Sequence, residues 1–301
     1  MQNSSNSDYV IESRRVQKAF NIAANNYDTF SILQRTITDR LLASFDHIKL
    51  EPTSILDLGS GTGYGSKILK QRFKKAHIYQ IDISGEMLKQ SRRQAPLFFS
   101  KNHFICANAS QIPLPKNHFD LVFSSLMLQW CNDLDAVFAE VKHVLKPGGV
   151  FLFTSFGPDS LKELRESWRQ VDDQVHVNVF VDMHDIGDSL VRNGLDAPVL
   201  SIEHIVLTYD ECKQLMRELK NIGAHNINKG RRKTLTGKQR LESVIKHYEI
   251  YRQNNKLPAT YEVIYGHAWQ PEVHKNSIKG ANIQTISLED LKQDLENRKS
   301  G

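Results

Sequence analysis

Residues 55–65 combine a carboxylate with four glycines at alternate positions, a combination suited to binding a charged small molecule. The run reads Ile-Leu-Asp-Leu-Gly-Ser-Gly-Thr-Gly-Tyr-Gly, in which Asp57 precedes Gly59, Gly61 and Gly63. An apolar segment that breaks into glycines predicts a buried parallel strand, a tight loop and the start of a helix. Open α/β sheets bind nucleotides at such junctions.

The glycine spacing argues against a dinucleotide. Its fingerprint needs Gly-x-Gly-x-x-Gly, but the third position is Tyr64 when counted from Gly59 and Ser66 when counted from Gly61. Asp57 would also repel a pyrophosphate and attract a cation. We therefore expect a nucleoside that has a positive charge and no phosphate, and S-adenosylmethionine is the common one.

Residues 55–65 resemble the E/D-x-G-x-G-x-G motif of class I S-adenosylmethionine-dependent methyltransferases. About 20 residues after the loop, the apolar run 77–82 ends on Asp82, where the ribose-binding acid is expected. Ile83 and Met87 follow it, as in the second motif of the family. The resemblance implies cofactor binding by the following residues: Asp57, Gly59, Gly61, Gly63, Asp82, Ile83 and Met87.

The segment after the third predicted strand, 103–106, departs from this family. Its members usually have an acid here that binds the adenine amino group, whereas this chain has Asn108 followed by Ala109. Asn108 can still accept a hydrogen bond through its amide oxygen, but without charge. We expect Asn108 and Ala109 to border the adenine.

The fourth predicted strand, 119–125, leads into a second set of candidate residues. Carboxyl ends of strands face the ligand crevice in such sheets, so we expect Ser124 to contact the methionine arm of the cofactor. Gln129 and Trp130 should border the acceptor. A tryptophan alone is more often part of a core, but its place beside Gln129 at a strand end favours a site.

A Rossmann-like α/β fold must position these residues. We expect a seven-stranded sheet that is mostly parallel, with 199–207 as its sixth strand and 260–268 as an antiparallel last strand. Helical apolar spacing before the first strand predicts an N-terminal lid over 11–47. The long segment between the last two strands, about 209–256, predicts a helical cap insertion.

Composition indicates one methyltransferase domain, residues 1–275, followed by a polar tail, 276–301. The 301 residues are 40% hydrophobic and 24% charged, enough for one substantial core. No apolar run approaches the roughly 20 residues that span a bilayer, and the N-terminus has no targeting pattern, so we expect a cytoplasmic protein. The three cysteines lack metal-ligand spacing, so we expect buried free thiols and no metal.

The predicted cap has a larger net positive charge than the whole chain. Residues 210–252 contain 11 Lys and Arg against 5 Asp and Glu, whereas the net charge of the protein is +5. The densest part includes Arg231, Arg232 and Lys233. This cluster favours an acidic partner at the mouth of the site. Nucleic acid fits less well, because few aromatic residues for base stacking lie among the charges.

The second half of the chain has a narrower resemblance. A set of segments resembles the malonyl-acyl carrier protein O-methyltransferases of biotin synthesis: the N-terminal lid and residues 129–131, 156–161, 176–178, 181–188, 219–224, 235–238 and 258–269. The match covers about 14–269. It implies methyl transfer to the free carboxylate of a malonyl thioester, carried by acyl carrier protein or CoA, which primes pimeloyl and biotin synthesis.

This reaction needs no general base, because a carboxylate is already ionised at neutral pH. We expect Tyr27, Gln129, Trp130 and His176 to form the acceptor site. Two alternatives remain open. A methyltransferase acting on a quinone-like precursor would need a base, for which His176 or His184 is available. A non-methylating assembly factor or hydroxylase could also use the same fold.

Overall fold

A computed structural model describes residues 10–95, 101–224, 226, 228 and 237–272. The chain divides into two units, Met1–Pro271 and Glu272–Gly301. All helices and strands of the described residues lie in the first unit. The predicted tail, 276–301, lies outside the described residues.

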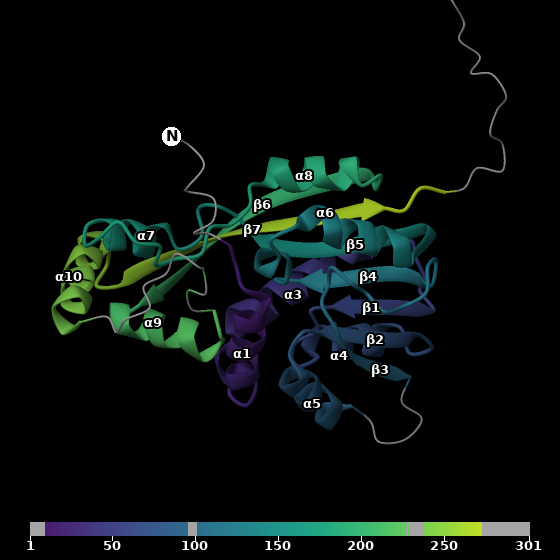
Figure 1. The fold of residues 1–301 in the computed structure, drawn as a ribbon, viewed down its shortest axis with the longest axis horizontal. Helices are drawn as coiled ribbons and strands as arrows, with labels where there is room; N and C mark the ends of the chain where they lie inside the picture. Colours follow the sequence, from purple (N-terminus) through teal and green to yellow (C-terminus); the bar gives the residue numbers. More distant parts are fainter. Residues whose placement is uncertain (1–9, 96–100, 225, 227, 229–236, 273–301) are drawn as a thin grey trace, which may run out of the picture. The chain divides into compact units, whose positions relative to one another are not determined.

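A seven-stranded sheet forms the centre of the first unit, in the order β3-β2-β1-β4-β5-β7-β6 (Figure 1). Its strands are β1 (Ser54–Leu58), β2 (His77–Asp82), β3 (Asn102–Cys106), β4 (Phe119–Ser125), β5 (Leu145–Phe156), β6 (Asp196–Tyr209) and β7 (Leu257–Trp269). Strands β1 to β5 pair in parallel, whereas β7 is antiparallel to both β5 and β6. The predicted seven-stranded fold class, with its antiparallel last strand, is confirmed.

Helices precede, connect or follow these strands. They are α1 (Ser13–Ala23), α2 (Tyr27–Phe30), α3 (Ile32–Ser44), α4 (Tyr64–Arg72), α5 (Gly85–Gln94), α6 (Leu134–Val144), α7 (Lys162–Arg169), α8 (Met183–Arg192), α9 (Cys212–Asn221) and α10 (Lys238–Tyr248). Short 3-10 turns are η1 (Phe45–His47), η2 (Leu128–Trp130) and η3 (Glu249–Tyr251).

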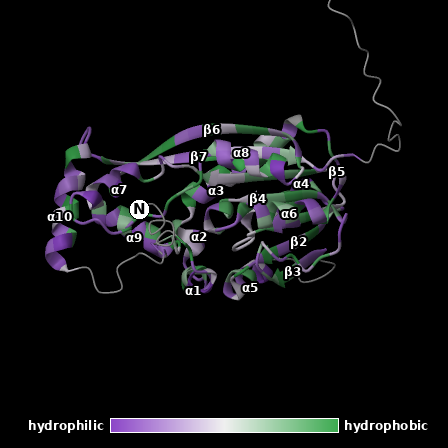
Figure 2. Ribbon diagram, turned by 45° about the horizontal axis from the view of Figure 1, so that its top comes forward, coloured by the Kyte–Doolittle hydropathy of each residue, from purple (hydrophilic) through white to green (hydrophobic). Residues whose placement is uncertain are grey.

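Both faces of the central strands are buried, which explains their continuous apolar runs. Leu56 and Val122 belong to a cluster with residues of α6 and α8. The alternate positions Ile55 and Leu121 belong to a second cluster, with residues of α3 and α4. Figure 2 shows hydrophobic colour concentrated in strands such as β4 and hydrophilic colour over outer helices such as α10. The two-residue period therefore assigns each side chain to one helical layer.

The start of β5 is irregular. Helix α6 ends at Val144, and Leu145 already pairs with Phe119. Pairing then shifts to Leu121 with Val150, so residues 146–149 form an irregularity in the strand. Gly148 has φ +76°, a conformation that favours glycine.

Three helices surround the long ends of β6 and β7, away from β1 to β3 (Figure 1). Residues 210–256 connect the two strands and include α9 and α10, and α7 packs beside α10. Leu164, Leu215, Val244 and Tyr248 are buried together here with Tyr261 of β7. This second core holds the cap helices against the sheet.

The cysteines are free, but only Cys212 is fully buried. Cys106 is exposed, so the expectation of three buried thiols is wrong for this residue. It is the last residue of β3, which lies at the edge of the sheet and has a neighbouring strand on one side only. Within the described ranges, no helix is long and apolar enough to cross a membrane.

Candidate functional site

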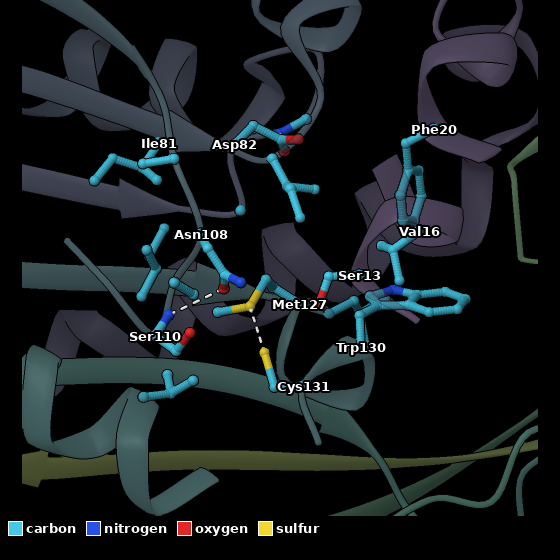
Figure 3. Close-up of a pocket in the computed structure, with 18 of the residues that line it drawn as sticks. Ser13, Val16, Phe20, Ile81, Asp82, Asn108, Ser110, Met127, Trp130 and Cys131 are labelled. Carbon is cyan, nitrogen blue, oxygen red and sulfur yellow. Dashed lines mark hydrogen bonds between the residues drawn. The ribbon is translucent and has the colours of Figure 1, made fainter. Parts of the chain in front are cut away.

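A first cavity, of about 220 Å³, lies at the carboxyl ends of the central strands. Gly59 follows β1, Asp82 ends β2, Asn108 follows β3 and Met127 follows β4, and all of them line it. Figure 3 shows Phe20 of α1 near Trp130, across the cavity from the end of β2. The N-terminal helix thus closes one side of a crevice formed by four strand ends.

The Asp82 carboxylate is fixed at the edge of this cavity by two hydrogen bonds. Its Oδ2 accepts a hydrogen bond from Gly61 N at 2.8 Å, and its Oδ1 accepts one from Ser84 N at 2.7 Å. Burial raises its pKa to about 6, although these two hydrogen bonds oppose the shift. Each carboxylate oxygen keeps a further lone pair, so the side chain can also accept from two hydroxyl groups.

The glycines of the loop have different roles. Gly59 and Gly61 line the first cavity and have φ of +79° and +53°. A Cβ at Gly59 would overlap Met127, whose own Cβ would lie 2.5 Å away. Gly63 lines none of the three cavities described here; it precedes α4, and a Cβ there would overlap Ser91. Gly63 therefore has a packing role against α5, and its cofactor contact stays a prediction.

Two other predicted cofactor residues also lie away from the first cavity. Asp57 is buried and accepts a hydrogen bond from Ser66 Oγ at 2.6 Å, and burial raises its pKa to about 7. It lines a third, smaller cavity instead. Ser124 lines none of the three cavities described here, and its buried hydroxyl donates to the Leu58 carbonyl at 2.8 Å. Side chains alternate along a strand, so Ser125 faces the crevice in its place.

The remaining predicted cofactor residues come together. Ile83, Met87, Asn108 and Ala109 all line the first cavity. The Asn108 Oδ1 atom accepts from Ser110 N at 3.1 Å, a contact drawn in Figure 3. This bond holds the segment after β3 in a turn, and Asn108 keeps its amide N–H groups and a second lone pair.

A second cavity, of about 190 Å³, adjoins the first and shares Phe20, Tyr27, Leu126 and Trp130 with it. Its other walls are mostly apolar and come from α7, α9 and the ends of β5 and β7; they include Leu161, Leu164, Trp168, Met216, Leu219 and Tyr261. The cap helix α9 therefore supplies part of a compartment next to the first cavity.

Tyr27, the first residue of α2, lines all three cavities. Burial, together with the charges of Asp82 and Asp28, raises the pKa of its hydroxyl well above the ordinary value. The hydroxyl therefore stays protonated at neutral pH and can donate a hydrogen bond.

Gln129 and Trp130 both line the second cavity, but the amide N–H of Gln129 is already partly used within the chain. Its Nε2 donates to the Leu126 carbonyl at 2.6 Å, while its buried Oε1 has no hydrogen-bond partner among the described residues. A donor role toward the acceptor therefore depends on the second N–H of the amide. Trp130 packs edge-to-face on Phe20, with ring centroids 5.3 Å apart, and lies between the two cavities.

The two candidate histidines are placed very differently. His176 lines the second cavity, stacks on Trp168 with ring centroids 3.7 Å apart, and pairs through Nε2 with Asp172 Oδ1 at 2.6 Å. His184 is exposed near the start of α8, pairs with Asp182, and lines none of the three cavities. Its position removes His184 as a candidate base.

Sequence reasoning missed several lining residues. Met127 and Ser125 lie within the segment that was singled out, and the two-residue period of β4 could have identified Ser125. Trp168 and Met216 come from helices distant in sequence. No local sequence pattern distinguishes an apolar side chain that lines this cavity from one that packs in the core.

Comparison with known proteins decides the family. Residues 56–153 match the family model described as a methyltransferase domain. A malonyl-acyl carrier protein O-methyltransferase of Methylovorus sp. (strain MP688) is 46% identical, over 88% of this chain and 91% of that protein. One from Nitrosospira multiformis is also 46% identical, over 94% of this chain and 97% of that protein. The chain belongs to the malonyl-acyl carrier protein O-methyltransferase family.

The fold comparison agrees with this membership. The crystal structure of the YcgJ protein from Bacillus subtilis aligns with a TM-score of 0.56 at 17% identity, covering 78% of this chain and 99% of that one. At this identity the likeness concerns the fold alone.

The chain is an S-adenosylmethionine-dependent methyltransferase, and the first cavity suits this methyl donor. Among the described residues that line it, none is Lys or Arg, as expected for a nucleoside without phosphate. Asp82 offers acceptors for ribose hydroxyls, and Ile83 and Ala109 offer apolar surface for a base. The quinone-type and non-methylating alternatives are not favoured by the relatives.

Proposed function

We propose that this protein transfers the methyl group of S-adenosylmethionine to the free carboxylate of a malonyl thioester, in the cytoplasm. The product is the malonyl methyl ester that primes pimeloyl and biotin synthesis. The main support is the second cavity, an apolar compartment that meets the first one at Tyr27, Leu126 and Trp130. The names of the relatives supply the substrate class.

In this proposal the cofactor lies in the first cavity, with its ribose on Asp82. Gly59 and Gly61 allow its close approach to the loop, and Asn108 and Ala109 border the adenine with Ile83 and Met87. Bound there, S-adenosylmethionine supplies an electrophilic methyl group on a positively charged sulfur. The protein then only has to align an oxygen of the acceptor with that methyl group.

The acceptor site works without a general base, because the malonyl carboxylate is ionised at neutral pH. The Tyr27 hydroxyl donates to it, and Phe20 and Trp130 exclude water from the junction of the two cavities. A neutral donor orients the oxygen while leaving it more nucleophilic than a full ion pair would. His176, held by Asp172, borders the same compartment at its Trp168 wall.

Replacing Tyr27 with phenylalanine should lower kcat by about 10-fold or more, since losing about 1.4 kcal/mol of transition-state orientation has this effect. Gln129→Leu should have a similar effect. Steady-state kinetics on malonyl-acyl carrier protein measures both, and cofactor affinity should stay nearly unchanged. Tyr251→Phe, in η3 and outside the three cavities, is the matched control. Normal turnover in both variants would mean that other residues hold the acceptor.

The reaction itself is tested by incubating the protein with methyl-labelled S-adenosylmethionine and one of four acceptors. Malonyl-acyl carrier protein and malonyl-CoA offer the carboxylate, acetyl-CoA lacks it, and succinyl-CoA displaces it by one methylene group. Label should enter a base-labile ester only with the malonyl thioesters. Equal labelling of acetyl-CoA, or none with either malonyl thioester, would contradict the proposed reaction.

We also propose that the acidic carrier protein docks on the basic cap near Arg231, Arg232 and Lys233, which lie outside the described residues. Helix α9 supports this site. Its exposed Lys213, Arg217 and Lys220 lie at helical spacing on one side, whereas Met216 and Leu219 line the second cavity. A carrier protein bound to this basic stripe would lie next to the acceptor compartment.

Reversing the charge of Arg231, Arg232 and Lys233 should raise KM for malonyl-acyl carrier protein and flatten its salt dependence, because electrostatic steering is lost. Turnover of malonyl-CoA should change little. Reversal of the exposed residues Lys67, Lys74 and Lys75 is a matched change in charge away from the cap. Equal losses on both malonyl substrates would point to a defect in folding or in the pocket.

A further inference from the structure

Three side chains of the types that bind metals meet outside the three cavities, on β6, β7 and the turn after β5. They are Asp159 in the turn, His204 of β6 and Glu262 of β7, and one ligating atom of each lies within 4.8 Å of those of the other two. His204 and Glu262 are opposite each other in the antiparallel pair, so their side chains share one face of the sheet. Imidazole and carboxylate groups are among the usual ligands of zinc.

Glu262 is the member of this cluster that indicates a ligand. It is only 7% exposed, yet it forms no ion pair within the part of the chain that the structure describes. Its Oε2 accepts one hydrogen bond, from Asp159 N at 2.6 Å, and its Oε1 has no hydrogen-bond partner among the described residues. A carboxylate this buried is costly unless a cation compensates its charge.

The chain already holds this carboxylate in place. The turn after β5 packs directly on it, since a Cβ at Gly157 would lie 2.6 Å from Cδ and Oε1 of Glu262. Ser160 Oγ donates to the Glu262 carbonyl at 3.0 Å and accepts from its backbone N–H at 3.1 Å. Asp159 and His204, each about half exposed, are the two side chains that have room to move.

The separation of the three ligands suits zinc after a small adjustment. Zinc binds nitrogen and oxygen at about 2.0–2.2 Å, so two ligand atoms of a tetrahedral site are about 3.3–3.6 Å apart. His204 Nε2 and Asp159 Oδ2 are 3.8 Å apart, close to this value. The remaining separations need movements of about 1 Å, within reach of exposed side chains. Magnesium and calcium prefer sites of oxygen atoms only, so the imidazole favours zinc.

The cations nearby do not compensate Glu262. Lys162 Nζ lies 3.0 Å from Asp159 Oδ2, and both side chains are about half exposed. Arg165 Nη2 donates instead to the carbonyls of Pro158 and Ser160, at 2.5 and 2.8 Å. An exposed ion pair contributes little to stability, so a metal ion can displace Lys162 from Asp159.

We infer that Asp159, His204 and Glu262 bind one zinc ion, with water completing its coordination. The three ligands come from segments far apart in the sequence, which is why no motif indicated them. The expectation of no metal considered only the cysteines, and this site uses none of them.

The zinc site goes beyond the proposed reaction. Tyr261 faces the second cavity, and side chains alternate along a strand, so Glu262 points to the other face of β7. Zinc bound there ties the turn after β5 to β6 and β7. Phe156 and Leu161, at the two ends of this turn, line the second cavity. The ion therefore stabilises one wall of that cavity without contacting its contents.

Calorimetric titration of zinc chloride into the full-length protein, freed of metal with EDTA, tests this assignment. His204→Ala removes an exposed ligand, and Glu262→Gln removes the buried charge but keeps an acceptor for Asp159 N. Each should weaken zinc binding at least 10-fold. Lys162→Gln should bind zinc at least as tightly as the wild type, because a competing cation is gone. Zinc at about 100 times its Kd should also raise Tm of the wild type by a few degrees, and by less in His204→Ala.

His77→Ala is the matched control and should keep the wild-type affinity. His77 is an exposed histidine of another cluster, where its Nδ1 lies 3.3 Å from His103 Nε2. The inference is wrong if the wild type binds no zinc, if His204→Ala and Glu262→Gln bind it as the wild type does, or if the loss follows His77→Ala instead. It is also wrong if Lys162→Gln loses affinity as His204→Ala does, since the cluster would then be an ion-pair network.

Discussion

Asp82→Ala should weaken S-adenosylmethionine binding at least 100-fold. A hydrogen bond to a charged group contributes about 1.5–3 kcal/mol, so two ribose hydroxyls account for about 3–6 kcal/mol. Each 1.4 kcal/mol is tenfold in affinity. The variant also frees the N–H groups of Gly61 and Ser84, which loosens the loop that borders the cofactor.

Isothermal titration calorimetry with S-adenosylmethionine measures this effect, and Asp188→Ala, exposed on α8, is the control. Wild-type affinity in a folded Asp82→Ala protein would remove Asp82 from the site.

The pH dependence of cofactor affinity gives a second check on Asp82. Because burial raises the pKa of Asp82 to about 6, cofactor affinity should fall as the pH drops through 6 and the carboxylate becomes protonated.

The raised pKa of Asp82 also affects the stability of the cofactor-free protein. Asp82 binds a proton more tightly when folded than when unfolded, because its pKa is raised from 3.8 to about 6. Its contribution to stability is therefore most favourable at low pH and is lost as the pH rises to about 6.

The second large effect is expected for Gly59→Ala, which should lower the free energy of unfolding by about 2–5 kcal/mol. Holding alanine at φ +79° costs about 1–2 kcal/mol, and overpacking against Met127 adds about 1–3 kcal/mol. Affinity for S-adenosylmethionine should fall as well, because the residue lines the first cavity.

Denaturant unfolding measures the loss, and Gly85→Ala is the matched control. Gly85 begins α5 in the same crevice region, its φ is negative, and a Cβ there would meet nothing within 4 Å. Gly85→Ala should therefore be neutral or slightly stabilising. Equal stability of the two variants would show that the glycine loop relaxes around the added methyl group without strain.

Much of the fold follows from local pattern. The strands are apolar on both faces, and α5 begins at Gly85 because Ser84 caps it by accepting from Met87 N. Asp82 was also predictable, since a strand ending in an acid about 20 residues after a glycine loop has few other uses. These features depend on residues that are close together in the sequence, so the sequence alone is enough to predict them.

The resemblance to the methyltransferase family also predicted the antiparallel last strand, and the length of the segment before that strand predicted the insertion. That insertion covers the second cavity with α9, whose Met216 and Leu219 face inward. Their inward direction depends on the packing of α9 against α2, α10 and β6. Hydrophobic spacing could identify the helix but not the compartment that it encloses.

Tertiary structure decided which polar groups belong to the site. Ser124 and Ser125 differ by one position, yet strand register turns the first toward Leu58 and the second toward the crevice. His184 and His176 looked equivalent until the fold separated them. Asp159, His204 and Glu262 lie in three separate segments and meet only because β7 pairs with both β5 and β6, and such a meeting depends on long-range packing that no local pattern contains.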